Sequence, residues 1–189
     1  MRHVSKPAFM LGKIMTFDHT LYLDFDGVLN AVEPQHDKVE NFVIKIENSL
    51  NFLPETFIVY SPNVVETLER LREQYKMELV WLTTWNENNT VLRLAEHLKG
   101  LDHGRVLPAN LHTAKVGKRE WTQWKAEAIL EDQKASERPF IWVDDNAHKY
   151  WGEAVNEGTE ASSLFVTPNS TWGLTKNNLD KMEQFLSQN

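Results

Sequence analysis

From Leu21 onward, short continuous runs of apolar residues alternate with longer segments in which apolar residues recur at helical spacing. Short apolar runs predict buried strands within residues 21–23, 77–82, 138–143 and 163–166. Between and after these runs, apolar residues at helical spacing predict helices that begin at Ser61, at about Asn88, after Lys118, at His148 and after Gly173. This alternation is typical of an α/β protein. We therefore predict a Rossmann-like three-layer sandwich, in which a central parallel sheet has helices on both faces and its ligand at the carboxyl edge.

Two segments depart from this alternation. Residues 1–20 lack a clear period, and we interpret them as an N-terminal arm or a short edge strand. The runs 42–46 and 56–60 are rich in β-forming residues, so residues 31–60 are predicted to form a small β-hairpin flap or cap insert, placed to lie over the end of the first strand. No repeat or low-complexity linker divides the chain, and residues 1–189 are expected to form a single domain.

Composition narrows the classes of function. The formal charge of −7 disfavours a broad electrostatic grip on nucleic acid, although a local basic patch can still hold one strand end. The absence of cysteine excludes disulfides, thiolate zinc sites and a thiol nucleophile. No apolar run is long enough to cross a bilayer, and no convincing signal-peptide cleavage site follows the start, so we expect a cytoplasmic protein with no membrane partner.

The first predicted strand ends in two carboxylates, Asp24 and Asp26, followed by Gly27. Alternation along an extended chain places both carboxylates on one side, where they and the carbonyl of Phe25 can approach a single Mg²⁺ ion. Gly27 allows the backbone to turn sharply. The alternative is that these residues only form the turn that leaves the strand, because Asp and Gly are common in turns.

A second apolar strand, within residues 138–143, also runs into two acids, Asp144 and Asp145. These carboxylates would complete an oxygen-rich Mg²⁺ site if the two strand ends are neighbours. Two hydrophobic strands that both end in paired acids are hard to explain by turn formation alone. The sequence therefore favours a metal-dependent site.

The strand at residues 77–82 ends in a polar segment that begins with Thr83. A hydroxyl at this position can bind a phosphate oxygen, and the following residues are further candidates for contact with phosphate or substrate: Thr84, Trp85 and Asn86. Threonine is equally common in strands and helix caps, which is the structural alternative. Lys118 and Lys125, around the next predicted helix, are both able to reach a phosphate as a point charge, although most lysines do not.

In order, these segments resemble the four-part signature of the haloacid dehalogenase (HAD) superfamily over about residues 21–186. The resemblance implies that Asp24 is a nucleophile that forms an aspartyl-phosphate and that Asp26 is the general acid and base. It implies that Thr83 binds the phosphoryl group, that Lys125 or Lys118 steadies its charge, and that Asp144 and Asp145 hold Mg²⁺ with Asp24. Members that act on carbon–halogen bonds lack the second aspartate, so Asp26 favours phosphate chemistry.

The amino-acid sequences of residues 81–86 and 140–145 are also similar to those of a minimally capped branch of this superfamily found in RNA-repair-type proteins. From the resemblance we expect a Mg²⁺-dependent phosphomonoester hydrolase with an open site. The expected substrate is a phosphorylated small molecule such as a nucleotide, or a nucleic-acid 3′-phosphate end. Two alternatives remain: a binding module that has kept the fold without catalysis, and a phosphotransferase that uses the same residues. The oligomeric state is left open.

Overall fold

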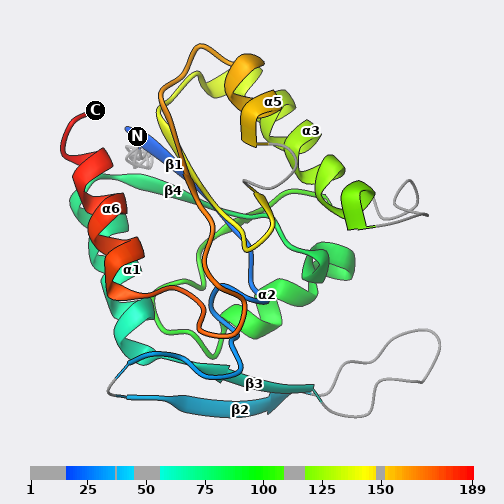
Figure 1. Ribbon diagram of the computed structural model, residues 1–189, viewed down its shortest axis with the longest axis vertical. Helices are drawn as coiled ribbons and strands as arrows, with labels where there is room; N and C mark the ends of the chain where they lie inside the picture. The colour runs from blue at the N-terminus through cyan, green and yellow to red at the C-terminus, as the bar shows by residue number, and fades with distance from the viewer. Residues whose placement is uncertain (1–15, 37, 45–55, 109–117, 148–151) are drawn as a thin grey trace, which may run out of the picture.

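A five-stranded parallel sheet forms the centre of the molecule in a computed structural model, which describes residues 16–36, 38–44, 56–108, 118–147 and 152–189 (Figure 1). The strand order is β5-β4-β1-β6-β7. The strands are β1 His19–Leu23, β4 Met77–Trp81, β5 Arg105–Val106, β6 Phe140–Val143 and β7 Ser163–Val166. The α/β fold predicted from the sequence is confirmed.

Helices cover both faces of this sheet, which gives the three layers expected of a Rossmann-like fold (Figure 1). Residues of α1, α2 and α6 share one apolar cluster with the sheet, whereas residues of α3 and α5 share another. The helices are α1 Pro62–Gln74, α2 Thr90–Ala95, α3 Lys118–Ser136, α5 Gly152–Glu157 and α6 Lys176–Leu186. None of the helices in the described segments is long and apolar enough to span a bilayer.

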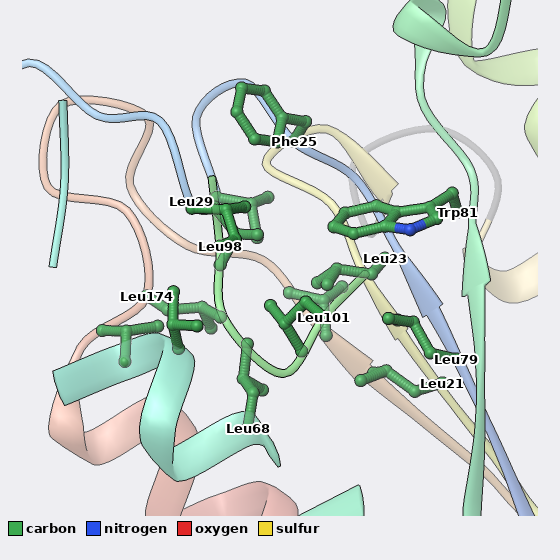
Figure 2. Close-up of a cluster of buried hydrophobic side chains, with 14 of the residues drawn as sticks. Leu21, Leu23, Phe25, Leu29, Leu68, Leu79, Trp81, Leu98, Leu101 and Leu174 are labelled. Atoms are coloured by element: carbon green, nitrogen blue, oxygen red, sulfur yellow. The ribbon is translucent and has the colours of Figure 1, made fainter. Parts of the chain in front are cut away.

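All five residues of β1 are buried, as expected for a central strand that has helices on both sides. Leu21 and Leu23 point into the larger apolar cluster, where Trp81 and Leu68 also lie (Figure 2). Tyr22 points to the opposite face and packs with the α3 side. Each leucine buried in this way stabilises the fold by about 1.5–3 kcal/mol. The strand that carries the candidate nucleophile is therefore firmly held.

The register of the sheet brings three strand ends to one level. Leu23 lies opposite Trp81 of β4 on one side and opposite Val143 of β6 on the other. The order of connection reverses at β1, since the chain first adds β4 and β5 on one side and then β6 and β7 on the other. Ligands of open α/β sheets bind at such a switch point, beyond the carboxyl ends of the strands. Asp24 and Asp144 directly follow two of these ends.

The predicted hairpin is present and consists of β2 Glu40–Ile44 and β3 Thr56–Tyr60, which pair in antiparallel fashion. Ile58 is fully buried, and the ring of Phe42 stacks on His97 with 4.4 Å between ring centroids. The Ala31 amide donates to the Val59 carbonyl at 3.0 Å. The hairpin is therefore packed against the core and joined to the segment that follows β1. Residues 45–55, which include the end of the predicted 42–46 run, lie outside the described segments.

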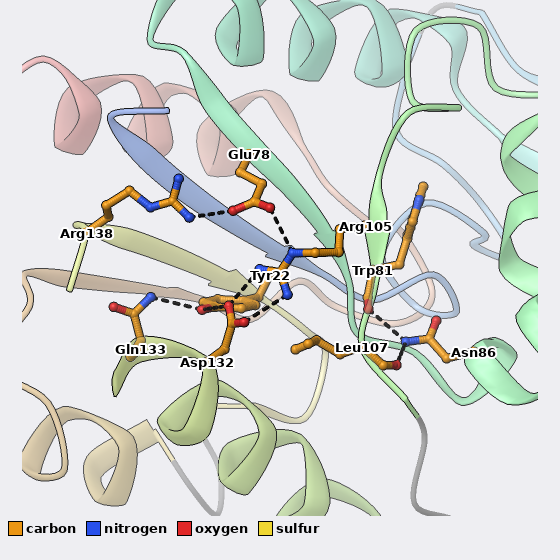
Figure 3. Close-up of polar contacts among 9 residues, drawn as sticks. All are labelled: Tyr22, Glu78, Trp81, Asn86, Arg105, Leu107, Asp132, Gln133 and Arg138. Carbon is orange, nitrogen blue, oxygen red and sulfur yellow. Dashed lines mark hydrogen bonds and ion pairs between the residues drawn. The ribbon is translucent and has the colours of Figure 1, made fainter. Parts of the chain in front are cut away.

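A chain of charged and polar groups ties the sheet to α3 (Figure 3). Arg105 of β5 donates to Glu78 of β4 at 2.8 Å and to both carboxylate oxygens of Asp132 on α3 at 2.8 Å. Tyr22 donates to Asp132 at 2.7 Å, and Arg138 donates to Glu78. Burial alone would raise the pKa of each acid, but the hydrogen bonds, chiefly from Arg105, outweigh it and hold both pKa values below the ordinary range.

Some element boundaries differ from the sequence prediction. Where the sequence predicts a helix from about Asn88, with apolar spacing that continues to Leu101, the structure has a 3₁₀ helix over Thr84–Asn89 followed by α2, which ends at Ala95. Leu98 and Leu101 remain buried in the turns that follow, and Gly100 adopts φ +97°, a conformation that no regular right-handed helix contains. The first strand begins at His19, two residues earlier than predicted. The predicted start of the helix at His148 lies outside the described residues, which resume at Gly152 in α5.

Candidate active site

Three charged side chains from different elements meet beyond the carboxyl ends of β1 and β6. The Lys125 ammonium, on α3, donates to Oδ2 of Asp24 at 2.6 Å and to Oδ2 of Asp144 at 2.6 Å. All three residues are at least nine-tenths buried. Charged groups are buried in this way only when they are paired, so the lysine and the two aspartates form one electrostatic unit.

The position of Lys125 follows from the packing of α3. Its neighbours Trp124 and Ala126 are buried in the same apolar cluster as Tyr22, which fixes this turn of the helix against the sheet. Burial alone would lower the pKa of Lys125, but the two carboxylates raise it above its ordinary value, so the lysine stays charged. Burial raises the pKa of Asp24 to about 7, an effect that Lys125 opposes and Asp144 reinforces.

Asp145 adds a third carboxylate to this site. Asp24, Asp144 and Asp145 each offer an oxygen atom, and these atoms lie within 4.8 Å of one another. Burial, followed by the charge of Asp144, raises the pKa of Asp145, because its negative charge is unfavourable there. Clustered carboxylate oxygens are the donors that hard divalent cations such as Mg²⁺ prefer, so the residues fit the predicted metal.

The turn after β1 bears on two members of the predicted ligand set. The carbonyl of Phe25 accepts backbone N–H groups from Val28, Leu29 and Asn30, which engage its oxygen in the turn, and its contact with metal stays a prediction. Asp26, also expected as a ligand, is not part of the carboxylate cluster found among the described residues. The strand ends at Leu23, so the alternation assumed for an extended chain no longer applies at Asp26.

Gly27 adopts φ +70°, as the predicted sharp turn requires. A Cβ atom at this position would lie 2.8 Å from Cγ of Asp145. Gly27 therefore allows the turn after β1 to approach the acidic segment after β6. Its place in the site is to bring the two strand ends together, and its predicted contact with phosphate or substrate stays a prediction.

Asp26 is exposed to solvent, and both of its carboxylate oxygens accept hydrogen bonds. The indole Nε1 of Trp85 donates to Oδ2 at 2.6 Å, and the Asn30 amide donates to Oδ1 at 2.8 Å. The structure thus brings Trp85, predicted from the sequence as a substrate-side residue, to the candidate acid and base. Asn30 was not predicted, since its role depends on which way its side chain points out of the turn.

Thr83 and Thr84 follow the end of β4, as predicted. Thr83 is fully buried, and its hydroxyl oxygen accepts a long hydrogen bond of 3.4 Å from the Trp85 backbone amide. Thr84 is half-buried and begins the 3₁₀ helix. Both residues directly precede Trp85 in the chain, and their contact with phosphate stays a prediction.

The side chain of Asn86 has a structural role that the sequence did not suggest. Its side-chain nitrogen donates to the carbonyl of Trp81 at 2.7 Å and to the carbonyl of Leu107 at 2.6 Å (Figure 3). Both hydrogens of the amide are therefore used to join the segments that follow β4 and β5. The predicted contact of Asn86 with phosphate or substrate stays a prediction.

Lys118 is the first residue of α3, and its side chain lies outside the described part of the structure. The structure therefore brings Lys125 to the carboxylates and leaves the role of Lys118 untested. Asn146 was missed by the sequence reasoning. Its backbone amide donates to Asp144 at 2.8 Å, and its side-chain nitrogen donates to Asp145 at 2.7 Å, so it orients both carboxylates.

A parallel sheet with this order, a carboxylate at the end of β1, two more after β6 and a lysine between them define a member of the HAD superfamily. Within it, the chain belongs to the family described as the HAD domain in Swiss Army Knife RNA repair proteins, whose model matches residues 20–179. No curated protein matches the chain. Membership of this family points to hydrolase activity of the phosphatase type.

Proposed function

We propose that this protein is a Mg²⁺-dependent phosphomonoester hydrolase that uses Asp24 as its nucleophile. The observation that carries the proposal is the contact of Lys125 with Asp24 and Asp144, both at 2.6 Å, beside the third carboxylate of Asp145. This arrangement places a fixed positive charge beside a carboxylate at a strand end. That charge is suited to stabilising phosphoryl oxygens.

In the first step, an oxygen of Asp24 attacks phosphorus and forms the aspartyl-phosphate. The bond between phosphorus and the ester oxygen breaks, and its electron pair passes to the leaving oxygen. Asp26 donates a proton to that oxygen, so the product leaves as an alcohol. Lys125 offsets the negative charge that Asp24 and the phosphoryl oxygens bring together.

In the second step, water attacks the phosphorus of the aspartyl-phosphate. The carboxylate of Asp26 accepts a proton from this water, the bond between phosphorus and Asp24 breaks, and its electron pair returns to Asp24. Inorganic phosphate is released and both aspartates regain their starting states. Mg²⁺ held by Asp24, Asp144 and Asp145 would neutralise charge on the phosphoryl group.

The proposed substrate is a nucleotide or a nucleic-acid end that carries a 3′-phosphate. The family description supports a connection with RNA repair. The net charge of −7 weighs against an extensive grip on a polymer, so contact would be local to the phosphorylated end. A phosphotransferase would use the same residues and pass the phosphoryl group to an alcohol in place of water.

The test is phosphate release from nucleotides, sugar phosphates and oligonucleotides with 3′- or 5′-phosphates, in Mg²⁺ or in EDTA. The Asp24→Asn variant removes the nucleophile, and Asp180→Asn, at an exposed aspartate of α6, is the matched control. Release that requires both Mg²⁺ and Asp24 supports the proposal. No release without an added alcohol, but transfer with one, would favour the phosphotransferase. Inactivity in every assay would favour a binding module.

A further inference from the structure

Asp26 occupies an unusual position for a side chain that must transfer a proton. It is exposed on a turn beyond β1, yet each of its carboxylate oxygens accepts one hydrogen bond, from Asn30 on Oδ1 and from Trp85 on Oδ2. An exposed aspartate would otherwise exchange among rotamers. One donor on each oxygen restricts the carboxylate to a single orientation, while each oxygen keeps a second lone pair for a proton.

The amide of Asn30 is itself fixed by the hairpin. Its Oδ1 accepts a hydrogen bond from the backbone amide of Val59, on β3, at 3.0 Å. Because a backbone N–H can only donate, the oxygen of the Asn30 side chain must face Val59, and the nitrogen must face Asp26. The side chain therefore acts as a directed link between the hairpin and Asp26.

The indole of Trp85 is fixed from its other side. Its ring packs edge-on against Phe25, with 6.3 Å between centroids, and Phe25 is fully buried. The distance of 2.6 Å from Nε1 of Trp85 to Oδ2 of Asp26 is short for an N–H···O hydrogen bond. Trp85 and Asn30 thus reach Asp26 from two separate segments, one after β4 and one after β1.

We propose that Trp85 and Asn30 are positioning residues that hold Asp26 in the orientation needed to protonate the leaving group. The inference rests on the proposed function, in which Asp26 gives its proton to the ester oxygen as the bond to phosphorus breaks. An alkyl leaving oxygen needs that proton, because an alkoxide is a poor leaving group. A nitrophenolate leaves without it. Loss of the two hydrogen bonds should therefore slow the cleavage of alkyl phosphates selectively.

The experiment compares an alkyl phosphate with p-nitrophenyl phosphate in the variants Trp85→Phe and Asn30→Ala. Asn30→Ala removes the donor to Asp26 without adding a charge beside it. General acid catalysis contributes about 10²–10⁴-fold, and we expect each variant to lower the single-turnover rate of alcohol release from the alkyl phosphate by about tenfold or more. The single-turnover rate of nitrophenolate release should change by less than about threefold, because this release needs no proton and precedes the hydrolysis step in which Asp26 acts as a base for both substrates. Trp172→Phe, at an exposed tryptophan, is the control.

A double-mutant comparison separates positioning from general damage. In an Asp26→Asn background, Trp85→Phe should have no further effect on the alkyl phosphate, because the group it positions is already lost. Equal losses for both substrates, or losses that add in the double variant, would overturn the proposal. An increase in KM at constant kcat would instead make Trp85 a substrate contact and would also overturn it.

A measurement that needs no turnover tests the contact itself. The indole proton of Trp85, assigned by its disappearance in Trp85→Phe, should resonate downfield in the ¹H–¹⁵N spectrum and move upfield in Asp26→Ala. An unchanged resonance would show that the hydrogen bond does not form in solution, and the proposal would fall even if the enzyme is active. A wild-type protein with the expected resonance but without phosphatase activity would count against the proposed function alone.

Discussion

Replacing Lys125 with methionine is expected to destabilise the protein strongly in the absence of divalent metal. Methionine keeps an unbranched apolar stem in the buried position but removes the ammonium group. Asp24 and Asp144, each now 2.6 Å from that ammonium and nearly inaccessible to water, would then face each other as uncompensated charges. The lysine variant therefore measures how much of the stability depends on this one group.

The magnitude follows from the burial of the partners. Removing one member of a buried ion pair costs about 3–5 kcal/mol, since the remaining charge has neither water nor a partner. For a chain of this size, each kcal/mol lowers the melting temperature by about 2–4 °C, so a fall of about 6–20 °C is expected. Mg²⁺ binding should restore part of the loss, by about 2.7 kcal/mol at a concentration of one hundred times its Kd.

The assay is urea unfolding at pH 8 in EDTA and then in Mg²⁺, for the wild type and Lys125→Met. Lys134→Met is the matched control, because Lys134 lies on the same helix and forms an exposed pair with Glu131. The control should unfold like the wild type. If Lys125→Met were as stable as the control in EDTA, the two aspartates would not depend on the lysine, and the electrostatic reasoning about the site would be refuted.

Two further predictions concern other parts of the structure. Gly27→Ala should weaken Mg²⁺ binding by about 10–100-fold, because the new Cβ displaces the Asp145 carboxylate. Titration calorimetry measures this change, and Gly158→Ala, at an exposed glycine, is the control. Arg105→Met should reduce the loss of stability in acid. Arg105 lowers the pKa of Asp132 in the folded state, so the ionised Asp132 stabilises the fold at pH values above the ordinary carboxyl pKa. This contribution disappears as the pH falls through the folded-state pKa. Urea unfolding at pH 3 and pH 6 should therefore differ less in the variant than in the wild type, and an equal difference would contradict the assignment.

The local pattern of apolar residues was sufficient to predict the strands of the fold that are fully buried. The apolar runs at β1 and β6 have one interpretation, because a central parallel strand is covered on both faces and needs no polar alternation. The end of α2 was harder to predict, since Leu98 and Leu101 continue the helical spacing while the backbone has already left the helix. Burial of apolar side chains does not distinguish a last helical turn from the turns that follow it.

The sequence indicated which residues are candidates for the site better than it indicated which of their side chains contact one another. Asp144 and Asp145 could be predicted because they directly follow an apolar run, and this change from apolar to acidic residues marks the end of a buried strand. The choice between the two candidate lysines depended on the direction of α3, which no local pattern records. Asn30 was invisible for a similar reason, because its partner Val59 is 29 positions away and the contact exists only once the hairpin has folded back.

The central place of β1 has a consequence for the order of events during folding. Its partner on one side is β6, and the pairing of Thr20 with Phe140 joins residues 120 positions apart. Contacts of such long sequence separation form slowly, because much of the chain must be ordered before they close. A nascent chain would therefore carry Asp24 long before Asp144 could reach it, and the ability to bind a phosphorylated ligand should appear only in the last phase of refolding.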